Sequence, residues 1–304
     1  MSKKISTLFL ILAGALWGCL SLFVSALSDR GFDSKEIGLI RISLCTVMLL
    51  IIILIRDRSL LRVRLRDMWM FVGTGIISVT LFSYCYFTTV INVEAGIAAS
   101  LLYTSPVFVM LFSAVLFRER ITAQKIAAIV LTVAGVALVS GMLGSGSALG
   151  PLDLLTGIGA GLFYSLYSIF GVYALRRYSS LTVTFYTFLL GTVGFLFMTN
   201  PIAVIEKTAA DPIVIPMELG LALFNGLLPY LFYTIGLGHT DASVAGVLVA
   251  VEPLVGCLIG IFVFRESVNP AKLIGIALIL SAIVLMNIRL KRKSAAAASA
   301  AESV

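Results

Sequence analysis

Apolar residues fall in long runs along the chain, and charged and turn residues separate one run from the next. A transmembrane helix needs about 20 predominantly apolar residues, and most of these runs reach that length. Ten spans are predicted, at residues 7–28, 35–55, 68–90, 94–117, 122–141, 151–175, 181–199, 216–237, 241–264 and 270–288. The pattern therefore predicts an all-α polytopic membrane protein with ten transmembrane helices.

The composition supports a membrane protein. Of the 304 residues, 60% are hydrophobic and 12% are charged, and a soluble domain could not bury so much apolar surface. The net charge of +7 is spread over short loops and chain ends rather than gathered on one surface. We therefore expect neither a soluble enzyme nor a nucleic-acid partner.

The chain also matches itself, without a gap, at an offset of 147 residues. The aligned pairs are Gly14 with Gly161, Trp17 with Tyr164, Pro106 with Pro253, Phe117-Arg118-Glu119 with Phe264-Arg265-Glu266, and Lys125 with Lys272. Prolines and charges are scarce in this composition, so their coincidence predicts a duplicated five-helix unit. We expect repeats over 1–145 and 146–290, followed by a disordered cytoplasmic tail over 291–304.

Five crossings per repeat make the two repeats inverted relative to each other. Secondary transporters of this architecture bind substrate near the midplane, between the halves. Of the 22 Lys and Arg residues, 16 lie on the side of both termini and five on the other, with Arg41 inside a span. This bias predicts that both termini are cytoplasmic.

A family resemblance rests on the repeated motifs. With Trp17-Gly18, the stretch SLLYTSPVFVMLFSAVLFRERIT and its echo GVLVAVEPLVGCLIGIFVFRESV, the chain resembles the EamA-type drug/metabolite transporter superfamily over about residues 5–290. The resemblance implies a ten-helix carrier of the bacterial inner membrane. It also implies export of amino acids or related small metabolites through a cavity lined by both halves, without naming a substrate.

Charged residues inside predicted spans are candidate functional groups, because a charge at the bilayer centre costs roughly 2.5 to 3.5 kcal/mol. Glu252 lies near the middle of the ninth span. It is either a site for proton coupling or a substrate amine, or a hydrogen-bonded glutamate that supports the broken helix. For Arg41, the favoured interpretation is a side chain that reaches the interface, and the alternative is pairing with Glu94 or a substrate carboxylate. Glu252 and Arg41 are assigned as coupling residues.

Two prolines interrupt predicted spans at equivalent depths. Pro106 removes the helix hydrogen bond to the carbonyl of Leu102, and Pro253 removes the bond to that of Val249. Freed carbonyls in a membrane need partners from neighbouring helices, water or a ligand. A packing kink would account for one proline, but a symmetric pair favours hinges beside a cavity.

Polar aromatic residues provide candidates for the cavity wall. Trp17 and Tyr164 are symmetry mates beside stripes of small residues, so both are predicted to line the cavity. The other substrate-binding candidates are Tyr103, Asn225, Tyr86 and Tyr233. Core packing remains the alternative for each. Rings with few fixed charges suit small amphipathic solutes.

Together these features predict a proton-coupled secondary exporter that works by alternating access, as a monomer or homodimer among membrane lipids. No GxxxxGK[ST] motif is present, and the four cysteines and His239 have no metal-ligand spacing, so no cofactor or metal is expected. Alternatives are an uncoupled facilitator, or a carrier of nucleotide-like or cationic drug-like solutes. An intramembrane enzyme is disfavoured, because it would need several converging polar groups at membrane depth.

Overall fold

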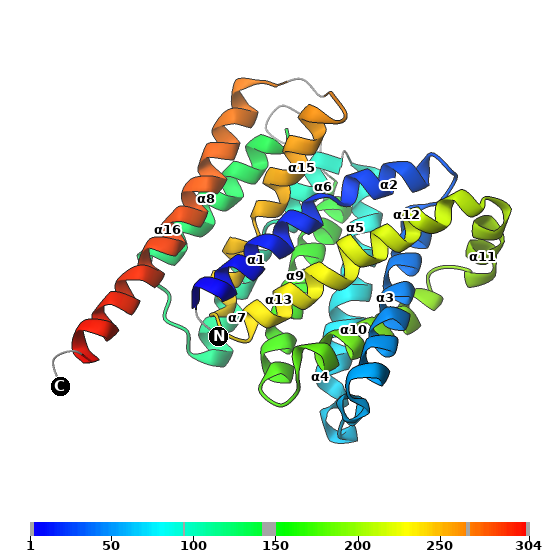
Figure 1. Ribbon diagram of the computed structural model, residues 1–304. Helices are drawn as coiled ribbons and strands as arrows, with labels where there is room; N and C mark the ends of the chain where they lie inside the picture. The colour runs from blue at the N-terminus through cyan, green and yellow to red at the C-terminus, as the bar shows by residue number, and fades with distance from the viewer. Residues whose placement is uncertain (1–2, 94, 142–149, 266–267, 302–304) are drawn as a thin grey trace.

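Helices make up every regular element of the computed structural model, which describes residues 3–93, 95–141, 150–265 and 268–301 (Figure 1). Capping residues fix where helices begin. Asp33 accepts hydrogen bonds from the amides of Lys35 and Glu36, both at 2.8 Å, and the Glu36 carboxyl accepts from the Asp33 amide. This capping box starts α3 (Ser34–Arg56).

Each of the ten predicted spans coincides with helix in the described residues, and seven helical stretches are long and apolar enough to cross a membrane. These seven are α1 (Lys3–Gly18) with α2 (Leu20–Ser28); α3; α4 (Met68–Val72), η3 (Gly73–Thr80) and α5 (Leu81–Asn92); α6 (Ala95–Leu102) with α7 (Ser105–Phe117); α9 (Pro151–Leu175); α12 (Ile215–Gly220), η6 (Leu221–Leu227) and α13 (Leu228–Leu237); and α14 (Ala242–Leu248) with α15 (Val251–Phe262).

The other predicted spans differ from a simple long helix. The helix α8 (Ala123–Val139) and the apolar part of α16, Pro270–Met286, are shorter. The helix α10 (Ser180–Leu196) is followed, after a bend of 96°, by α11 (Pro201–Ala210), where Asn200 caps the new helix. Short helical turns η1 (Arg58–Leu61), η2 (Leu65–Asp67) and η5 (Pro212–Val214) complete the described elements.

The C-terminal segment corrects one expectation. The helix α16 runs from Pro270 to Ala301, so residues 291–301 continue the helix and do not form the predicted disordered tail. This segment is rich in alanine, which has the highest intrinsic helix propensity.

Three backbone features recur, to within one residue, at the offset of 147 residues found in the sequence. Helix is interrupted between α6 and α7 at residues 103–104, and between α14 and α15 at 249–250. The π-helical segments η3 and η6 lie at corresponding positions. Arg118 and Arg265, which end α7 and follow α15, both adopt left-handed conformations, with φ of 54° and 55°. The predicted interruptions near Pro106 and Pro253 are therefore present.

The first helix of each repeat packs on the other repeat. The helix α1 contacts α13, α14 and α15, whereas α9 contacts η3, α5, α6 and α7. One continuous core cluster includes buried residues from both repeats, from Leu10 to Met286. The helices α8 and α16 lie side by side at one edge of the molecule (Figure 1).

Glycines allow close approach where the prolines interrupt the helices. A Cβ added to Gly14 of α1 would lie 2.6 Å from the carbonyl oxygen of Val249, and one added to Gly161 of α9 would lie 3.0 Å from that of Leu102. These are the two carbonyls that lose their helix partner to proline. Each interruption is therefore covered by a glycine of the opposite repeat.

We expect Gly14→Ala to destabilise the protein, because its Cβ would meet backbone that cannot turn aside. Overpacking of this kind costs about 1 to 3 kcal/mol, and the melting temperature in detergent should fall. Gly159→Ala is the control, since its Cβ would meet only the Cys85 sulfur at 3.5 Å. Equal melting temperatures for the two variants would show that the approach of α1 to Val249 is not tight.

Candidate functional site

Five aromatic side chains from three helices meet between the two repeats. Trp17 of α1 packs edge-on against Tyr230, with ring centroids 5.0 Å apart, and its ring lies 5.5 Å from that of Tyr233. Tyr167 of α9 contacts the same two tyrosine rings, at 5.3 and 5.7 Å. Tyr230 and Tyr233 are three residues apart in α13, as Tyr164 and Tyr167 are in α9, so each pair shares a helix face.

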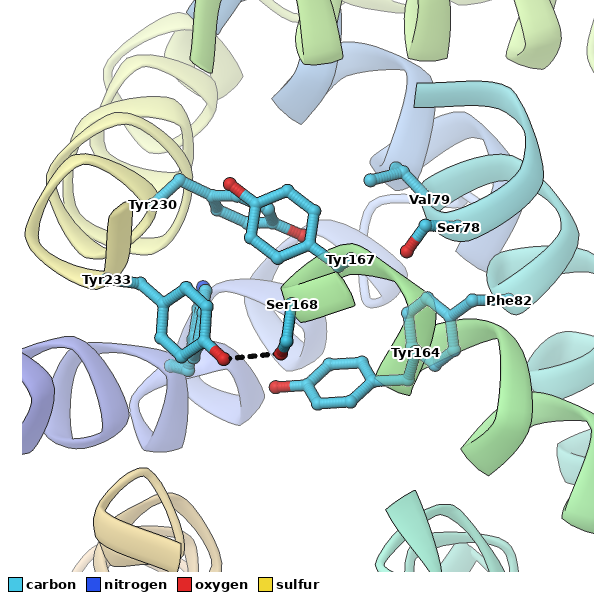
Figure 2. Close-up of a pocket in the computed structure, with 9 residues that line it drawn as sticks. Ser78, Val79, Phe82, Tyr164, Tyr167, Ser168, Tyr230 and Tyr233 are labelled. Carbon is cyan, nitrogen blue, oxygen red and sulfur yellow. Dashed lines mark hydrogen bonds between the residues drawn. The ribbon is translucent and has the colours of Figure 1, made fainter. Parts of the chain in front are cut away.

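A small cavity lies among these rings (Figure 2). Its volume is about 20 Å³, which is room for about one water molecule. The Tyr233 and Ser168 hydroxyls share a hydrogen bond of 2.6 Å at its wall. The lining residues are Trp17, Ser78, Val79, Phe82, Tyr164, Tyr167, Ser168, Tyr230 and Tyr233. They come from both repeats, so a larger solute could enter only if some of these rings moved.

Three of the predicted binding residues line this cavity, namely Trp17, Tyr164 and Tyr233. Tyr167 and Tyr230 were not predicted to do so, although their three-residue spacing from Tyr164 and Tyr233 could have marked them. Nothing in the sequence distinguishes the other lining residues from ordinary helix positions.

Glu252 lies beside the aromatic cluster. It is the second residue of α15, follows the interruption at 249–250, and is partly exposed. Its carboxyl is within electrostatic range of the hydroxyls of Tyr86, Tyr103 and Tyr164. Tyr103 is 7% exposed, and its hydroxyl has no hydrogen-bond partner by geometry within the described residues. The predicted residues Tyr86 and Tyr103 therefore lie near Glu252 rather than on the small cavity.

Arg41 and Asn225 form a polar contact between α3 and η6. The Arg41 guanidinium donates to the Asn225 side-chain oxygen at 3.1 Å. The Asn225 amide nitrogen donates to the carbonyls of Leu16 at 2.9 Å and Trp17 at 3.2 Å. These carbonyls lie at the end of α1, where the helix no longer supplies donors for all of them. Asn225 thus joins three helical segments and does not line the small cavity.

This contact corrects the favoured interpretation of Arg41. Asn225 is fully buried and lies about halfway along the span Pro212–Leu237. A guanidinium bonded to Asn225 points toward the interior of the protein, whereas a snorkelling side chain would end at the interface. Glu94, the alternative partner, lies outside the described residues.

The packing of α3 on η6 allows Arg41 to reach this position. A Cβ at Gly226 would lie 2.2 Å from the Cys45 sulfur and 3.3 Å from Arg41 Cγ. The Cys45 thiol, one turn after Arg41, donates to the carbonyl of Ala222 at 3.1 Å. Gly226 therefore provides the space along which the Arg41 side chain lies.

A second polar cluster joins the repeats at the ends of α7 and α13. We call Glu119, Lys125, Asp241, Ala242 and Ser243 the Glu119 cluster. The Glu119 carboxylate accepts from Lys125 Nζ at 2.9 Å, from the Ala242 amide at 3.1 Å and from the Ser243 hydroxyl. Lys125 also lies 3.6 Å from the Asp241 carboxylate. The repeated Arg-Glu and Lys of the sequence were a signal for this cluster, which was not predicted as such.

An open hollow of about 490 Å³ adjoins the Glu119 cluster. Its charged and polar lining includes Arg176, which stacks over Phe117 at 5.2 Å, and His239. His239 is exposed and its Nδ1 lies 3.0 Å from the Ile235 carbonyl, as expected for a polar turn residue. The hollow lies between the ends of α7, α9 and α13.

The chain belongs to the EamA-like transporter family, which matches residues 4–141 and 152–288. It is 24% identical over 278 residues to an uncharacterized transporter of Archaeoglobus fulgidus, covering 91% of this chain and 96% of that protein. It is 26% identical over 218 residues to the threonine/homoserine exporter RhtA of Escherichia coli (strain K12), covering 70% of this chain and 69% of that protein.

Two further comparisons agree with this assignment. The chain is 27% identical over 232 residues to a probable terminal-alkyne amino-acid exporter of Streptantibioticus cattleyicolor, covering 75% of this chain and 76% of that protein. A solved crystal structure has the same fold, with a TM-score of 0.75 at 20% identity, covering 96% of this chain and 99% of that chain. The protein is therefore a polytopic membrane transporter.

We expect Trp17→Ala and Tyr164→Ala to weaken ligand binding by roughly tenfold or more, as truncation of a central aromatic contact does. A ligand found by a thermal-shift screen over amino acids, nucleosides and cationic drugs is the probe, and the amount of folded protein on size exclusion is the folding measure. Trp69→Phe is the control, because Trp69 is 48% exposed and outside the cavity. Binding like that of the parent in both alanine variants would show that the two rings serve only packing.

Proposed function

We propose that this protein exports small metabolites, amino acids or related zwitterions, across the bacterial inner membrane by alternating access of two inverted five-helix repeats. The observation that carries the proposal is the cavity between the repeats, lined by Trp17 of the first and Tyr164 of the second. Two relatives are named as amino-acid or threonine/homoserine exporters, which supports the substrate class.

The repeat architecture has independent support. The family matches two segments, 4–141 and 152–288, that correspond to the predicted repeats. The paired helix interruptions, π-helical segments and left-handed arginines also recur at one offset. In this proposal α8, α16 and α10 are crossings as well, so the chain has ten spans and each repeat enters from the opposite side.

The orientation with both termini in the cytoplasm rests on the distribution of Lys and Arg. A fluorescent protein fused to the C-terminus should fluoresce, and alkaline phosphatase fused at the same position should be inactive. Fusions in the turn after α2 should give the reverse result. Active phosphatase at the C-terminus would contradict the orientation and, with an N-terminus on the cytoplasmic side, the even number of spans.

The present conformation supports an alternating mechanism. The cavity of about 20 Å³ is too small for an amino acid, and aromatic side chains of both repeats close it. The Glu119 cluster ties α7 of the first repeat to the start of α14 of the second. Substrate passage therefore needs the repeats to move relative to each other, and the interruptions beside Pro106 and Pro253 are the proposed hinges.

Glu252 is the proposed proton-coupling residue. A carboxyl group can gain or lose a proton, and at this depth each charge state favours a different arrangement of its surroundings. Its symmetry mate in the first repeat is Ser105, so the acid is particular to one half. Its partial exposure beside Tyr103 and Tyr164 gives protons and a substrate amine access to one group.

Glu252→Gln should retain exchange of labelled substrate but lose uphill transport driven by a pH gradient, because glutamine keeps the shape and fixes the neutral state. In an antiporter substrate accumulates on the acidic side, so liposomes with an acidic lumen provide the measurement. Glu218→Gln is the matched control: Glu218 is also an acid within an apolar span, but it is buried and bonded to the Thr208 hydroxyl at 2.7 Å, and it does not line the cavity.

Three outcomes separate the roles of Glu252. Uphill accumulation in Glu252→Gln equal to the parent would show that coupling does not use this residue. Loss of exchange in a folded variant would assign it to substrate binding instead. Loss of uphill transport in Glu218→Gln as well would show that the assay reports general damage.

A further inference from the structure

Arg41 carries a charge that no acid of the described structure neutralises by a direct ion pair. The ion pairs of the described residues involve Arg30, Lys125, Arg177 and Lys207. Arg41 instead donates to a neutral amide, that of Asn225. A cation within a membrane span whose charge no acid neutralises is costly, and such residues mark sites for charged ligands.

The guanidinium is held in place rather than free to move. Asn225 is itself fixed by two hydrogen bonds to α1, and the stem of Arg41 lies against Gly226. Only one of the five guanidinium N–H groups is used in the Asn225 contact. The remaining donors have the planar spacing that matches a carboxylate.

Arg41 lies at the edge of the aromatic cluster. It is within electrostatic range of the Tyr230 hydroxyl, which lines the small cavity, and of the Glu252 carboxyl. Tyr167, on the same cavity, is 6% exposed and its hydroxyl has no hydrogen-bond partner in the described residues. A cation and an acid thus lie within electrostatic range of each other and of tyrosines that line the cavity, although neither charged side chain lines the cavity itself.

The repeats are symmetric in their backbone contacts here but not in their charges. Ser78 donates to the carbonyl of Phe163 at 2.9 Å, just as Asn225, its mate at the offset of 147, donates to that of Leu16 at 2.9 Å. Both contacts tie a π-helical segment to the first helix of the opposite repeat. The Asn225 side-chain oxygen also accepts from Arg41, whereas the mate of Arg41 in the other repeat is Phe188, which has no donor for Ser78.

The symmetry mates of the three polar residues are nonionic. Phe188 corresponds to Arg41, Ser78 to Asn225 and Ser105 to Glu252. Duplication alone would not give the first repeat a cation and the second an acid, each without an ionic mate. Their joint departure from the repeat indicates a ligand that is itself unsymmetric in charge.

We propose that Arg41, positioned by Asn225, binds the carboxylate of a zwitterionic substrate whose ammonium group faces Glu252. The proposal rests on the transport function above and specifies the carboxylate as the group that the site recognises. In the conformation described, the cavity beside these residues holds only about 20 Å³, so binding accompanies displacement of the rings that line it.

The test compares amino acids with their amides, which keep the amine and remove the carboxylate charge. Kd values for L-threonine and L-threoninamide, and for other acid–amide pairs, are measured on purified full-length protein by titration calorimetry. The parent should prefer the acid by about tenfold or more, since the amide cannot form the charge-assisted pair. Arg41→Gln should bind acid and amide equally.

Two variants keep the result interpretable if Arg41→Gln does not fold. Arg41→Lys retains the cation and should keep a reduced preference for the acid, because lysine lacks the planar fork. Asn225→Ser copies the repeat mate and should weaken binding of the acid more than that of the amide. Arg30→Gln is the matched control, since Arg30 pairs with Asp211 at the surface and should not affect the preference.

A parent protein that binds amides as tightly as acids would overturn the proposal, even if it transports them. Full acid preference in a folded Arg41→Gln variant would overturn it as well. If carboxylates without an amine bind and depend on Arg41, the role of Arg41 stands and the amino-acid substrate class fails. A parent that binds none of the acids or amides contradicts both.

Discussion

The contact between a glycine of one repeat and an interrupted helix of the other is the constraint on which the arrangement of this protein depends. Proline removes the donor four residues after a carbonyl, and lipid cannot replace it. At Val249 the Glu252 amide donates instead, at 2.9 Å. Gly14 and Gly161 bring α1 and α9 against these carbonyls at Val249 and Leu102. A larger side chain at either glycine would push the first helix of one repeat away from the other. The interruption, the close approach and the interface between the repeats are therefore one feature. Trp17 and Tyr164, three residues after the two glycines, both line the cavity at this interface.

The π-helical segments make a second pair of contacts between the repeats. Ser78 and Asn225 each reach the backbone of the opposite repeat's first helix, so η3 binds α9 and η6 binds α1. An extra residue in the turn of a π-helix redirects the side chains that follow, and such segments occur often at functional sites. Here the redirected residues are the ones that join the repeats. The Glu119 cluster adds an ionic contact between the repeats at the ends of α7 and α13. In the proposed alternating mechanism, relative movement of the repeats would break this cluster.

Much of the fold was predictable because it depends on strong local signals. Long apolar runs indicate the helical segments, and scarce prolines and charges at one offset indicate the repeat and the positions of its interruptions. The placement of Trp17 and Tyr164 on one cavity followed from symmetry alone. The direction of Arg41 was not predictable, because it depends on Asn225 and Gly226, which are almost 200 residues away in sequence. The 96° bend after α10 was not predicted either. It occurs where Asn200 caps a new helix and a proline follows, and hydropathy does not reveal such a cap. The length of α16 was not predicted because low complexity is typical of disorder, whereas the alanines that make this segment simple also favour helix.

Some features of this protein recur in both repeats and others occur in only one. The recurring features build the helical framework, whereas the residues proposed to bind substrate do not recur. An inverted repeat can exchange the conformations of its halves at little cost, because the interactions that break on one side resemble those that form on the other. Glycines, prolines, π-helical segments and left-handed arginines follow this symmetry, and they form the frame. Arg41, Asn225 and Glu252 do not follow it, and all three occur where α3, η6 and α15 approach the aromatic cluster. A solute with separated charges can be held in one orientation only by a site whose own charges are separated. In the proposed mechanism the same unsymmetric charges would remain in place whichever half opened, so a zwitterionic substrate would keep its anchoring groups while the helices around it moved.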